Sequence, residues 1–195
     1  MSADLTRIAV LASGEGTNFQ ALLDGVHGQD GLEVVALVAS KPGIPALDRA
    51  AKAAVESVVF ARPDFEGDRE ARDRAMAEWL LDRNVGLIVT AGWMELLTST
   101  FLDSFKDHVV NVHPSLLPDF PGMDAVGQAV AARAERIGVT VHLVDEGVDT
   151  GAVLLQEGVP LPAGITAEQA AQLTRPIEHR LLPEAVRQLA SSRLP

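Results

Sequence analysis

Residues 111–118 place an amide and an imidazole two positions apart, directly after a short apolar run. In an extended backbone, side chains two residues apart lie on the same face, so Asn111 and His113 would point the same way while Val112 packs beneath them. Pro114 would then end the strand, because proline cannot donate to the hydrogen-bond ladder of a sheet. Open α/β sheets bind ligands beyond the carboxyl ends of their strands, where this pair would lie. The spacing fits a reactive pair and equally fits a polar strand end before a loop.

Acid/base work by His113 needs a carboxylate that fixes the ring tautomer and stabilises its protonated form. Three carboxylates, Asp145, Glu146 and Asp149, share the turn at 145–151. We favour Asp149, since it lies in a glycine-bracketed turn that can bend toward a neighbouring strand. Asp145 and Glu146 could equally be exposed, so spacing alone leaves the choice open.

The other histidines do not suggest a metal site. His27 and His108 look like surface positions, His142 within a strand is predicted to be a core or supporting group, and His179 is ambiguous. No two histidines on one element have metal-ligand spacing. We therefore predict no metal.

A glycine-containing loop at residues 13–18 follows the apolar run 7–12 and precedes a helix. Strand, glycine turn and helix bring free backbone N–H groups and the positive helix end toward an anion. The loop is not a dinucleotide fingerprint, because Phe19 stands at the third glycine position, and it is not a P-loop, because no Lys follows Gly16. A lone phosphate on a small molecule fits best, although such a loop can also be only a turn.

The apolar pattern elsewhere predicts alternating strands and helices without a linker or repeat, typical of a doubly wound α/β sheet. Further strands are expected at 32–39, 57–60, 85–90, 138–144 and 152–156, the last two forming a hairpin. Helices are expected at 46–55, at 68–83 and from Thr166, which starts a capping box. Pro176 should kink the closing helix or split it in two.

Helix 68–83 and the loop after strand 85–90 carry two further signals. The helix should bury the stripe Ala71, Ala75, Met76, Trp79 and Leu80. Arg69 and Arg72 lie at its start, where the helix dipole disfavours cations, so one of them could face an anionic ligand, with solvation as the default. The apolar loop 91–97 could line a pocket for a flat ring or simply pack.

The composition favours a soluble, intracellular protein that acts on small molecules. The chain has 195 residues, 47% of them apolar, a net charge of -11 and no cysteine. Its length suggests a single domain spanning residues 1–195. Nucleic acid is disfavoured as a partner, because its binding depends on clustered Lys and Arg. No apolar stretch approaches the ~20 residues that cross a bilayer, so no membrane partner is expected.

Four motifs together resemble the phosphoribosylglycinamide formyltransferases. They are SGEGTN at 13–18, NVHPSLLP at 111–118, GVTVH at 138–142 and DTG at 149–151. The resemblance runs from about residue 7 to about residue 190. It implies a Rossmann-like formyltransferase domain with a mostly parallel sheet and helices on both faces, acting in the cytoplasm as a monomer or homodimer.

The resemblance also implies a reaction. A formyl group would pass from 10-formyltetrahydrofolate to the glycine amine of glycinamide ribonucleotide in purine synthesis, with Asn111, His113 and Asp149 in the catalytic places. The Asn111 amide and protonated His113 would stabilise the oxyanion of the tetrahedral carbon. Asp149 would keep His113 charged, and a water that it holds could move the proton.

The resemblance also implies which residues bind each of the two substrates. Gly16, Thr17 and Asn18 would bind the ribonucleotide phosphate, and Glu178 would contact the ribonucleotide. The folate would be held by Arg69, Met94, Glu95, Leu96, Leu97 and Asn111, largely through backbone groups of the loop.

Some residues depart from the family pattern. Glu95 stands where a basic residue is usual, Asp124 where a histidine is common, and Ala152 where a proline is familiar. Related methionyl-tRNA formyltransferases and formyltetrahydrofolate hydrolases normally carry an additional domain, for which this chain has no room. A hydrolase or a catalytically idle nucleotide-binding module on the same fold remain the alternatives.

Overall fold

The computed structural model describes residues 5–191 as strands interspersed with helices. The strands are β1 (Thr6–Ala12), β2 (Leu32–Ala39), β3 (Glu56–Val59), β4 (Leu87–Thr90), β5 (Val109–His113), β6 (Arg136–Leu143) and β7 (Val153–Pro160). The helices are α1 (Thr17–Gly25), α2 (Pro45–Lys52), α3 (Arg69–Leu81), α4 (Ser99–Ser104), α5 (Ala125–Ala131) and α6 (Ala167–Ser191), and η1 (Arg62–Phe65) is a 3-10 turn. Within the described range, no helix is both long and apolar enough to cross a membrane.

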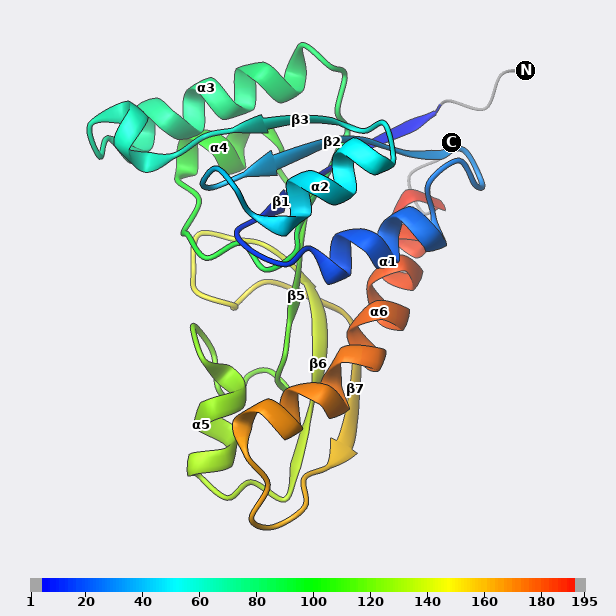
Figure 1. The fold of residues 1–195 in the computed structure, drawn as a ribbon, viewed down its shortest axis with the longest axis vertical. Coiled ribbons are helices and arrows are strands. Elements are labelled where there is room, and N and C mark those ends of the chain that lie inside the picture. Colours follow the sequence, from blue (N-terminus) through cyan, green and yellow to red (C-terminus); the bar gives the residue numbers. More distant parts are fainter. Residues whose placement is uncertain (1–4, 192–195) are drawn as a thin grey trace.

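All seven strands form one sheet in the order β3-β2-β1-β4-β5-β6-β7. The first five strands along the chain pair in parallel, whereas β6 and β7 run antiparallel as a hairpin at one edge (Figure 1). The strand order reverses beside β1, as in other doubly wound sheets. The predicted α/β class, with a mostly parallel sheet, is confirmed.

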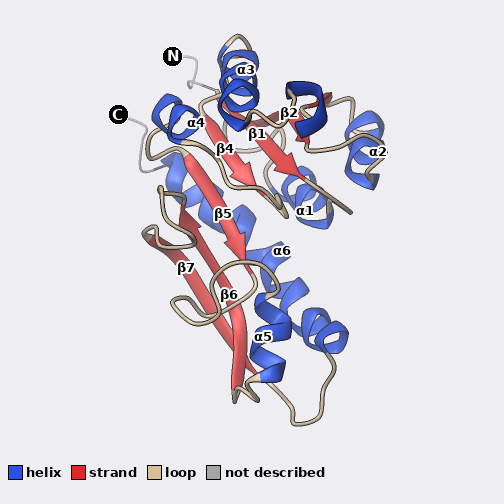
Figure 2. Cartoon of the chain, turned by 90° about the vertical axis from the view of Figure 1, so that its left-hand side faces the viewer, coloured by secondary structure: helices blue, strands red, loops and turns tan. Residues whose placement is uncertain are grey.

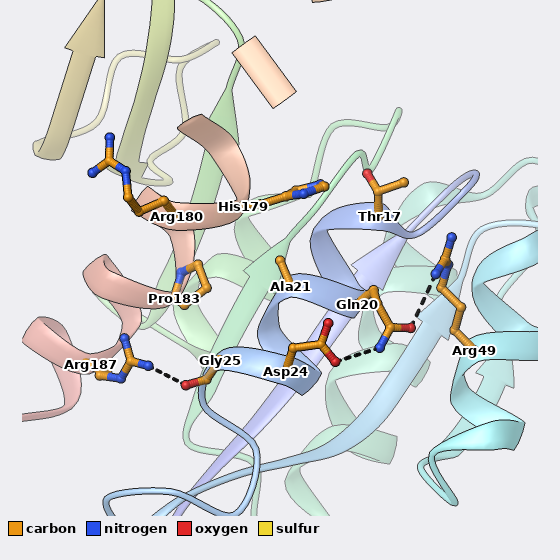
Figure 3. A pocket seen from close by; sticks show the side chains of 10 residues that line it. All are labelled: Thr17, Gln20, Ala21, Asp24, Gly25, Arg49, His179, Arg180, Pro183 and Arg187. Carbon is orange, nitrogen blue, oxygen red and sulfur yellow. Dashed lines mark hydrogen bonds between the residues drawn. The ribbon is translucent and has the colours of Figure 1, made fainter. Parts of the chain in front are cut away.

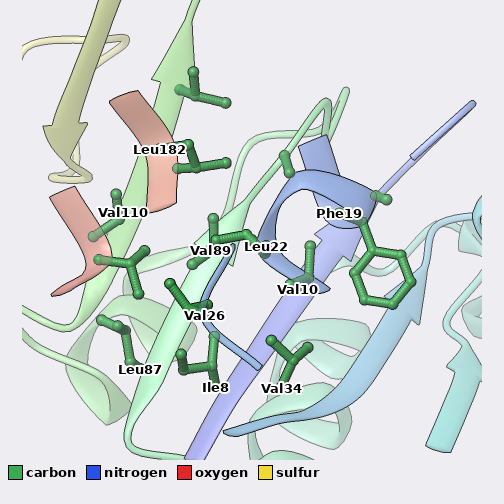
Figure 4. Close-up of a cluster of buried hydrophobic side chains, with 14 of the residues drawn as sticks. Ile8, Val10, Phe19, Leu22, Val26, Val34, Leu87, Val89, Val110 and Leu182 are labelled. Carbon is green, nitrogen blue, oxygen red and sulfur yellow. The ribbon is translucent and has the colours of Figure 1, made fainter. Parts of the chain in front are cut away.

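Alternate residues of the central strands contribute to two different cores. On β1, Ile8 and Val10 enter one cluster while Ala9 and Leu11 enter the other, because successive side chains point to opposite faces. Helices α1, α2 and α6 cover the first face, and α3 with α4 covers the second (Figure 2). Figure 4 shows the first cluster, where Phe19 and Leu22 of α1 and Leu182 of α6 meet the strands.

Helix α6 is continuous from Ala167 to Ser191, with Pro176 and Pro183 inside it. Of the two outcomes predicted for Pro176, a kink or a split into two helices, the split is therefore wrong. Tertiary packing overrides the local penalty, since Ile177, Leu181 and Leu182 are buried against the sheet. The helix is preceded by the predicted capping box, in which the Thr166 N–H donates to Gln169 Oε1 and the Gln169 N–H donates to Thr166 Oγ1.

Helix α3 corrects the predicted apolar stripe. Met76 and Leu80 are fully buried, but Ala71, Ala75 and Trp79 remain partly exposed. The same helix also buries a charged pair, Arg72 and Asp73, neither of which has any exposed surface. The stripe is confirmed in part, since Met76 and Leu80 are in the core and Ala75 and Trp79 pack against it, but the buried Arg72–Asp73 pair was missed because a pattern of apolar residues does not reveal a buried ion pair. Trp79, expected in the core, packs against the edge of the second cluster and also lies against the Arg83 guanidinium.

Two short helices were not predicted. Helix α4 follows the loop after β4 and adds Phe101 and Leu102 to the second core. Helix α5 lies within the segment after β5, where Asp124 accepts a hydrogen bond from the Gly127 N–H and caps its start. Asp124, one of the residues that depart from the family pattern, thus has a structural role as the N-cap of α5.

Candidate active site

Three neighbouring strands present a row of polar side chains on one face of the sheet. Thr90 at the end of β4 pairs with Asn111 on β5, and Asn111 pairs with His142 on β6. Because paired residues of adjacent strands point to the same face, the three side chains lie next to one another. We call this set the polar row.

The Asn111 amide has a defined orientation within the polar row. Its Oδ1 accepts a hydrogen bond from Thr90 Oγ1 at 2.8 Å, and its Nδ2 donates to Asp149 Oδ1 at 3.3 Å. The reversed amide would place its oxygen against that carboxylate, which is repulsive. Nδ2 also lies 3.2 Å from His142 Nε2, which can accept when that ring is neutral. The amide therefore presents its donors toward the space between β5 and the Asp149 turn.

His113 lies at the end of β5, and only 5% of the residue is exposed. Its Nδ1 is 3.4 Å from Asp149 Oδ2, and its Nε2 donates to the Phe120 carbonyl at 2.9 Å. Both ring nitrogens thus face oxygen acceptors, an arrangement that satisfies the doubly protonated ring. Pro114 ends β5 immediately afterwards, as predicted.

Asp149 reaches the site from the turn between β6 and β7, in a left-handed conformation with φ of 55°. The Gly122 N–H donates to its Oδ2 at 2.7 Å. The His142 hydrogen bond is the largest influence that lowers the pKa of this carboxyl, followed by the Gly122 N–H and the charge of His113; burial opposes them, and the pKa falls to about 2. Of the three carboxylates in the turn, the structure brings Asp149 to the histidine. Asp145 instead holds the turn through Gly147 and Thr150.

Thr90 is a site residue whose part the sequence did not reveal, whereas His142, predicted to be a core or supporting group, is confirmed as a buried neighbour of Asn111 and Asp149. His142 is 1% exposed, with Nδ1 2.8 Å from the Leu143 carbonyl and Nε2 3.5 Å from Asp149 Oδ1. Thr90 was assigned only to a central strand. The sequence did contain a signal for a role in the site, because each of the two is a polar residue inside an apolar strand. Pairing of the strands places both beside Asn111.

The glycine loop after β1 has the geometry of an anion site. Gly16 precedes α1 with φ of 70°, and a Cβ there would lie 2.7 Å from Ala46 Cβ. Only glycine fits this conformation and this close approach to α2. The first N–H groups of α1, starting at Thr17, have no acceptor within their own helix and carry the positive end of its dipole.

Asn18 joins this loop to the closing helix. Its Nδ2 donates to Glu178 Oε2 at 2.7 Å, although 160 positions separate the two residues in the sequence. The two predicted ribonucleotide contacts are therefore neighbours. Asn18 Oδ1 is buried and has no hydrogen-bond partner within the described residues.

A pocket between α1 and α6 opens beside this loop (Figure 3). Thr17 and Gln20 line it from α1, and His179 and Pro183 line it from α6. Arg49 of α2 borders it, donating from Nε to the Glu15 carbonyl at 2.9 Å and from Nη1 to Gln20 Oε1 at 3.3 Å. Arg180 and Arg187 of α6 also line the pocket and Asp24 is its one carboxylate, so its wall is cationic on balance in a protein that is acidic overall, which suits an anionic ligand.

The expected folate residues are less closely grouped. Met94 and Leu96 project from the loop after β4 with 61% and 55% exposure, whereas Leu97 is half-buried. The Met94 N–H donates to Ser13 Oγ at 3.0 Å, which ties this loop to the glycine loop. Arg69 is exposed at the start of α3. Glu95 turns inward and pairs with the buried Arg72.

This geometry is typical of a class of protein: an α/β enzyme with side chains suited to acid/base group transfer beside a helix end suited to an anion. No cluster of His, Asp or Glu within residues 5–191 has the arrangement of a metal site. The side chains of this site supply the Asn111 amide as a hydrogen-bond donor, the His113 imidazole and the Asp149 carboxylate. A reaction that develops negative charge on a carbonyl oxygen suits that set.

Comparison with known proteins identifies the family. The formyl transferase family matches residues 6–186, and the chain belongs to it. Phosphoribosylglycinamide formyltransferase of Bacillus subtilis is 37% identical over 186 residues, covering 95% of both chains. The crystal structure of glycinamide ribonucleotide transformylase 1 from Symbiobacterium toebii superposes with a TM-score of 0.94 at 39% identity, covering 98% of this chain and 91% of that one.

A longer relative also matches. The trifunctional purine biosynthetic protein adenosine-3 of Drosophila pseudoobscura pseudoobscura is 40% identical over 197 residues. The chain spans 14% of that protein. The similarity to this protein is therefore to one segment of a much larger polypeptide.

Proposed function

We propose that this formyl transferase moves the formyl group of 10-formyltetrahydrofolate to the glycine amine of N1-(5-phospho-D-ribosyl)glycinamide, in purine biosynthesis. Relatives that match over nearly their full length carry the name phosphoribosylglycinamide formyltransferase. The observation that carries the proposal is the contact of Asn111 and His113 with one carboxylate, Asp149. The glycine loop before α1 would bind the phosphate of the acceptor.

Asn111 and His113 would act on the formyl oxygen. Attack of the amine on the formyl carbon makes a tetrahedral centre whose oxygen gains negative charge. The Asn111 Nδ2 and the protonated His113 ring would donate to that oxygen, and donors fixed in advance stabilise such charge without reorganising. The formyl oxygen would replace the Phe120 carbonyl as acceptor for His113 Nε2.

Asp149 would hold His113 in its charged form and move a proton. Its depressed pKa, about 2, keeps the carboxylate ionised at neutral pH, opposite the ring Nδ1. The amine must lose a proton and the folate nitrogen must gain one as the carbon–nitrogen bond breaks. A water hydrogen-bonded to Asp149 would carry this proton between them.

The ribonucleotide would lie across the α1 end and α6. The N–H groups of Gly16, Thr17 and Asn18 would hold its phosphate, aided by the helix dipole. Glu178 would accept from a ribose hydroxyl while keeping its contact with Asn18. In this pose the glycine amine would point toward the polar row.

The folate would lie along the loop after β4. Backbone groups of Met94, Glu95, Leu96 and Leu97 would meet the pterin, the exposed Met94 and Leu96 side chains would cover its ring, and Asn111 would touch the formyl end. Arg69 is exposed and forms no ion pair with the other residues of 5–191, so it is available to the folate carboxylates.

We further propose that the chain works in the cytoplasm as one formyltransferase domain, alone or as a homodimer. Its partners would be small-molecule substrates, with neither nucleic acid nor membrane required. Its net charge of -11 supports the exclusion of nucleic acid.

Formyl transfer can be followed by absorbance with 10-formyl-5,8-dideazafolate as donor, with and without glycinamide ribonucleotide. Turnover that requires the ribonucleotide is the expected result. Turnover without it would indicate a hydrolase, and ribonucleotide binding without any turnover would indicate a catalytically idle module. Either of the last two results would overturn the proposal.

A further inference from the structure

A buried ionic cluster lies beneath the loop after β4. Arg72 has no exposed surface and is the largest fully buried side chain among the described residues. Its Nε and Nη2 bind Asp73 Oδ1 at 2.8 and 2.6 Å, and its Nη1 binds Glu95. The arginine thus joins a carboxylate on its own helix to a carboxylate on the loop.

The same cluster fixes the loop at several other points. Asp73 Oδ2 accepts from the Thr98 N–H at 2.7 Å, so Asp73 links Arg72 to the end of the loop. The Trp93 ring lies 5.6 Å from the Arg72 guanidinium carbon. At the other side of the loop, the Met94 N–H is held by Ser13 Oγ. The segment 93–98 is therefore held at residues 93, 94, 95 and 98.

Between these anchors the backbone is left free. The N–H and C=O groups of residues 95–97 make no hydrogen bond to the rest of the described chain, 5–191. Met94 and Leu96 point outward beside them. A loop held from beneath, with open backbone groups and exposed apolar side chains above, is preorganised for a flat heteroaromatic ligand with polar edges.

We infer that Arg72, Asp73 and Glu95 form a positioning unit that holds the backbone of residues 93–97 in shape for the pterin of the formyl donor. The inference rests on the proposed function. Glu95 then serves the folate site through Arg72, with its carboxylate turned away from the ligand. This explains how an acidic residue is tolerated where the family usually has a basic one.

The charges of the cluster support a fixed geometry. Arg72 faces Asp73 and Glu95, and the Arg62 Nε lies 4.0 Å from Glu95, so two cations offset two anions. Removing one member of a buried pair leaves an uncompensated charge, which is costly, so the cluster resists rearrangement. Arg62 is 54% exposed and contributes little, because solvent screens such pairs.

The test compares three variants of the full chain. Glu95→Ala removes the carboxylate that ties the loop to Arg72. Glu95→Gln keeps an oxygen that can accept from Arg72 Nη1 and serves as the rescue. Arg62→Ala is the matched control, because it removes the exposed partner of the same carboxylate and leaves the buried contacts in place.

Kinetics with 10-formyl-5,8-dideazafolate distinguish positioning from general damage. For Glu95→Ala, we expect KM for the folate to rise about tenfold while kcat and KM for the ribonucleotide stay within about twofold, the pattern of lost donor binding. Glu95→Gln should recover most of the loss. Arg62→Ala should change each constant by less than about twofold.

Amide hydrogen exchange tests the cluster without using activity. Glu95→Ala should speed exchange at Met94 and Thr98, whose N–H groups bond Ser13 and Asp73, while Arg62→Ala should not. Unchanged exchange would overturn the inference, as would faster exchange with equal losses for both substrates. If wild-type protein shows no formyl transfer but the exchange pattern holds, the proposed function fails and the cluster as a loop support survives.

Discussion

The glycine loop after β1 and the polar row on β4 to β6 use opposite means to handle charge. The loop presents backbone N–H groups and a helix end, and its main requirement is the left-handed Gly16 against Ala46. The polar row, with His113 and Asp149 beside it, presents side chains that are oriented by strand pairing and by hydrogen bonds among Thr90, Asn111 and His142. The first is built to bind a fixed charge, and the second to meet a charge that develops during reaction.

The difference predicts how each region responds to mutation. A site made of backbone groups loses little when one side chain changes, provided that the chain path is kept. A site made of side chains loses its function with a single truncation, because no neighbour has the same chemistry. Four substitutions test this contrast.

The largest effect is expected for His113→Ala. The variant loses the ring that donates to the oxyanion, so kcat should fall about a thousandfold, within the range for a lost acid/base group. Affinity for the ribonucleotide should remain near normal, because the phosphate is bound elsewhere. Steady-state formyl transfer measures the first quantity, and wild-type turnover would end the assignment.

Asp149→Asn should follow, with kcat reduced about a hundredfold, since His113 loses the carboxylate that stabilises its charge. The substitution also predicts a pH effect on stability. The pKa of Asp149 is lowered in the folded protein from 3.8 to about 2, so its ionised form stabilises the fold above about pH 4, and that stability is lost as the pH falls toward 2.

Chemical denaturation across this pH window measures the effect. The difference in unfolding free energy between wild type and Asp149→Asn should be roughly 2 kcal/mol larger at about pH 5 than at about pH 2. A difference that does not vary with pH would contradict the hydrogen-bonding and charge environment assigned to this carboxyl.

His142→Leu should lower kcat about tenfold, because Asn111 and Asp149 lose a shared partner but keep their contact with each other. His142→Gln is the matched control, since its amide can accept from Asn111 Nδ2 or donate to Asp149 Oδ1. Equal kcat values for the two variants, with equal melting temperatures, would show that His142 does not orient Asn111.

The smallest effect is expected for Asn18→Ala. Its side chain bridges to Glu178, but the phosphate would still meet backbone N–H groups. Affinity for the ribonucleotide should fall about fivefold, with kcat nearly unchanged. Calorimetric titration provides the measurement, and unchanged affinity would remove Asn18 from the site.

Much of the fold follows from patterns local to the chain. The buried strands, the β6–β7 hairpin and the capping box at Thr166 each depend on a few consecutive residues. The continuous α6 did not follow, because packing against the sheet outweighs the local effect of Pro176. Short α4 and α5 also lack a full apolar period to detect.

The candidate site divides in the same way. Asn111, His113 and the glycine loop were recognisable from spacing. The sequence left three carboxylates of one turn as candidate partners of His113, and only the folded hairpin shows that Asp149 makes the contact. Thr90 and His142 required the register of β4, β5 and β6. Burial of Arg72 depends on Glu95, 23 positions away, and no local pattern reports such a pairing.

The division of labour between the two regions is tested most directly by one paired measurement. The rate of a single formyl-transfer turnover and the Kd for glycinamide ribonucleotide are determined on the same samples of His113→Ala and Asn18→Ala. The account predicts that His113→Ala loses the rate and keeps the Kd, while Asn18→Ala weakens the Kd and keeps the rate. A parallel loss of both quantities in either variant would contradict it.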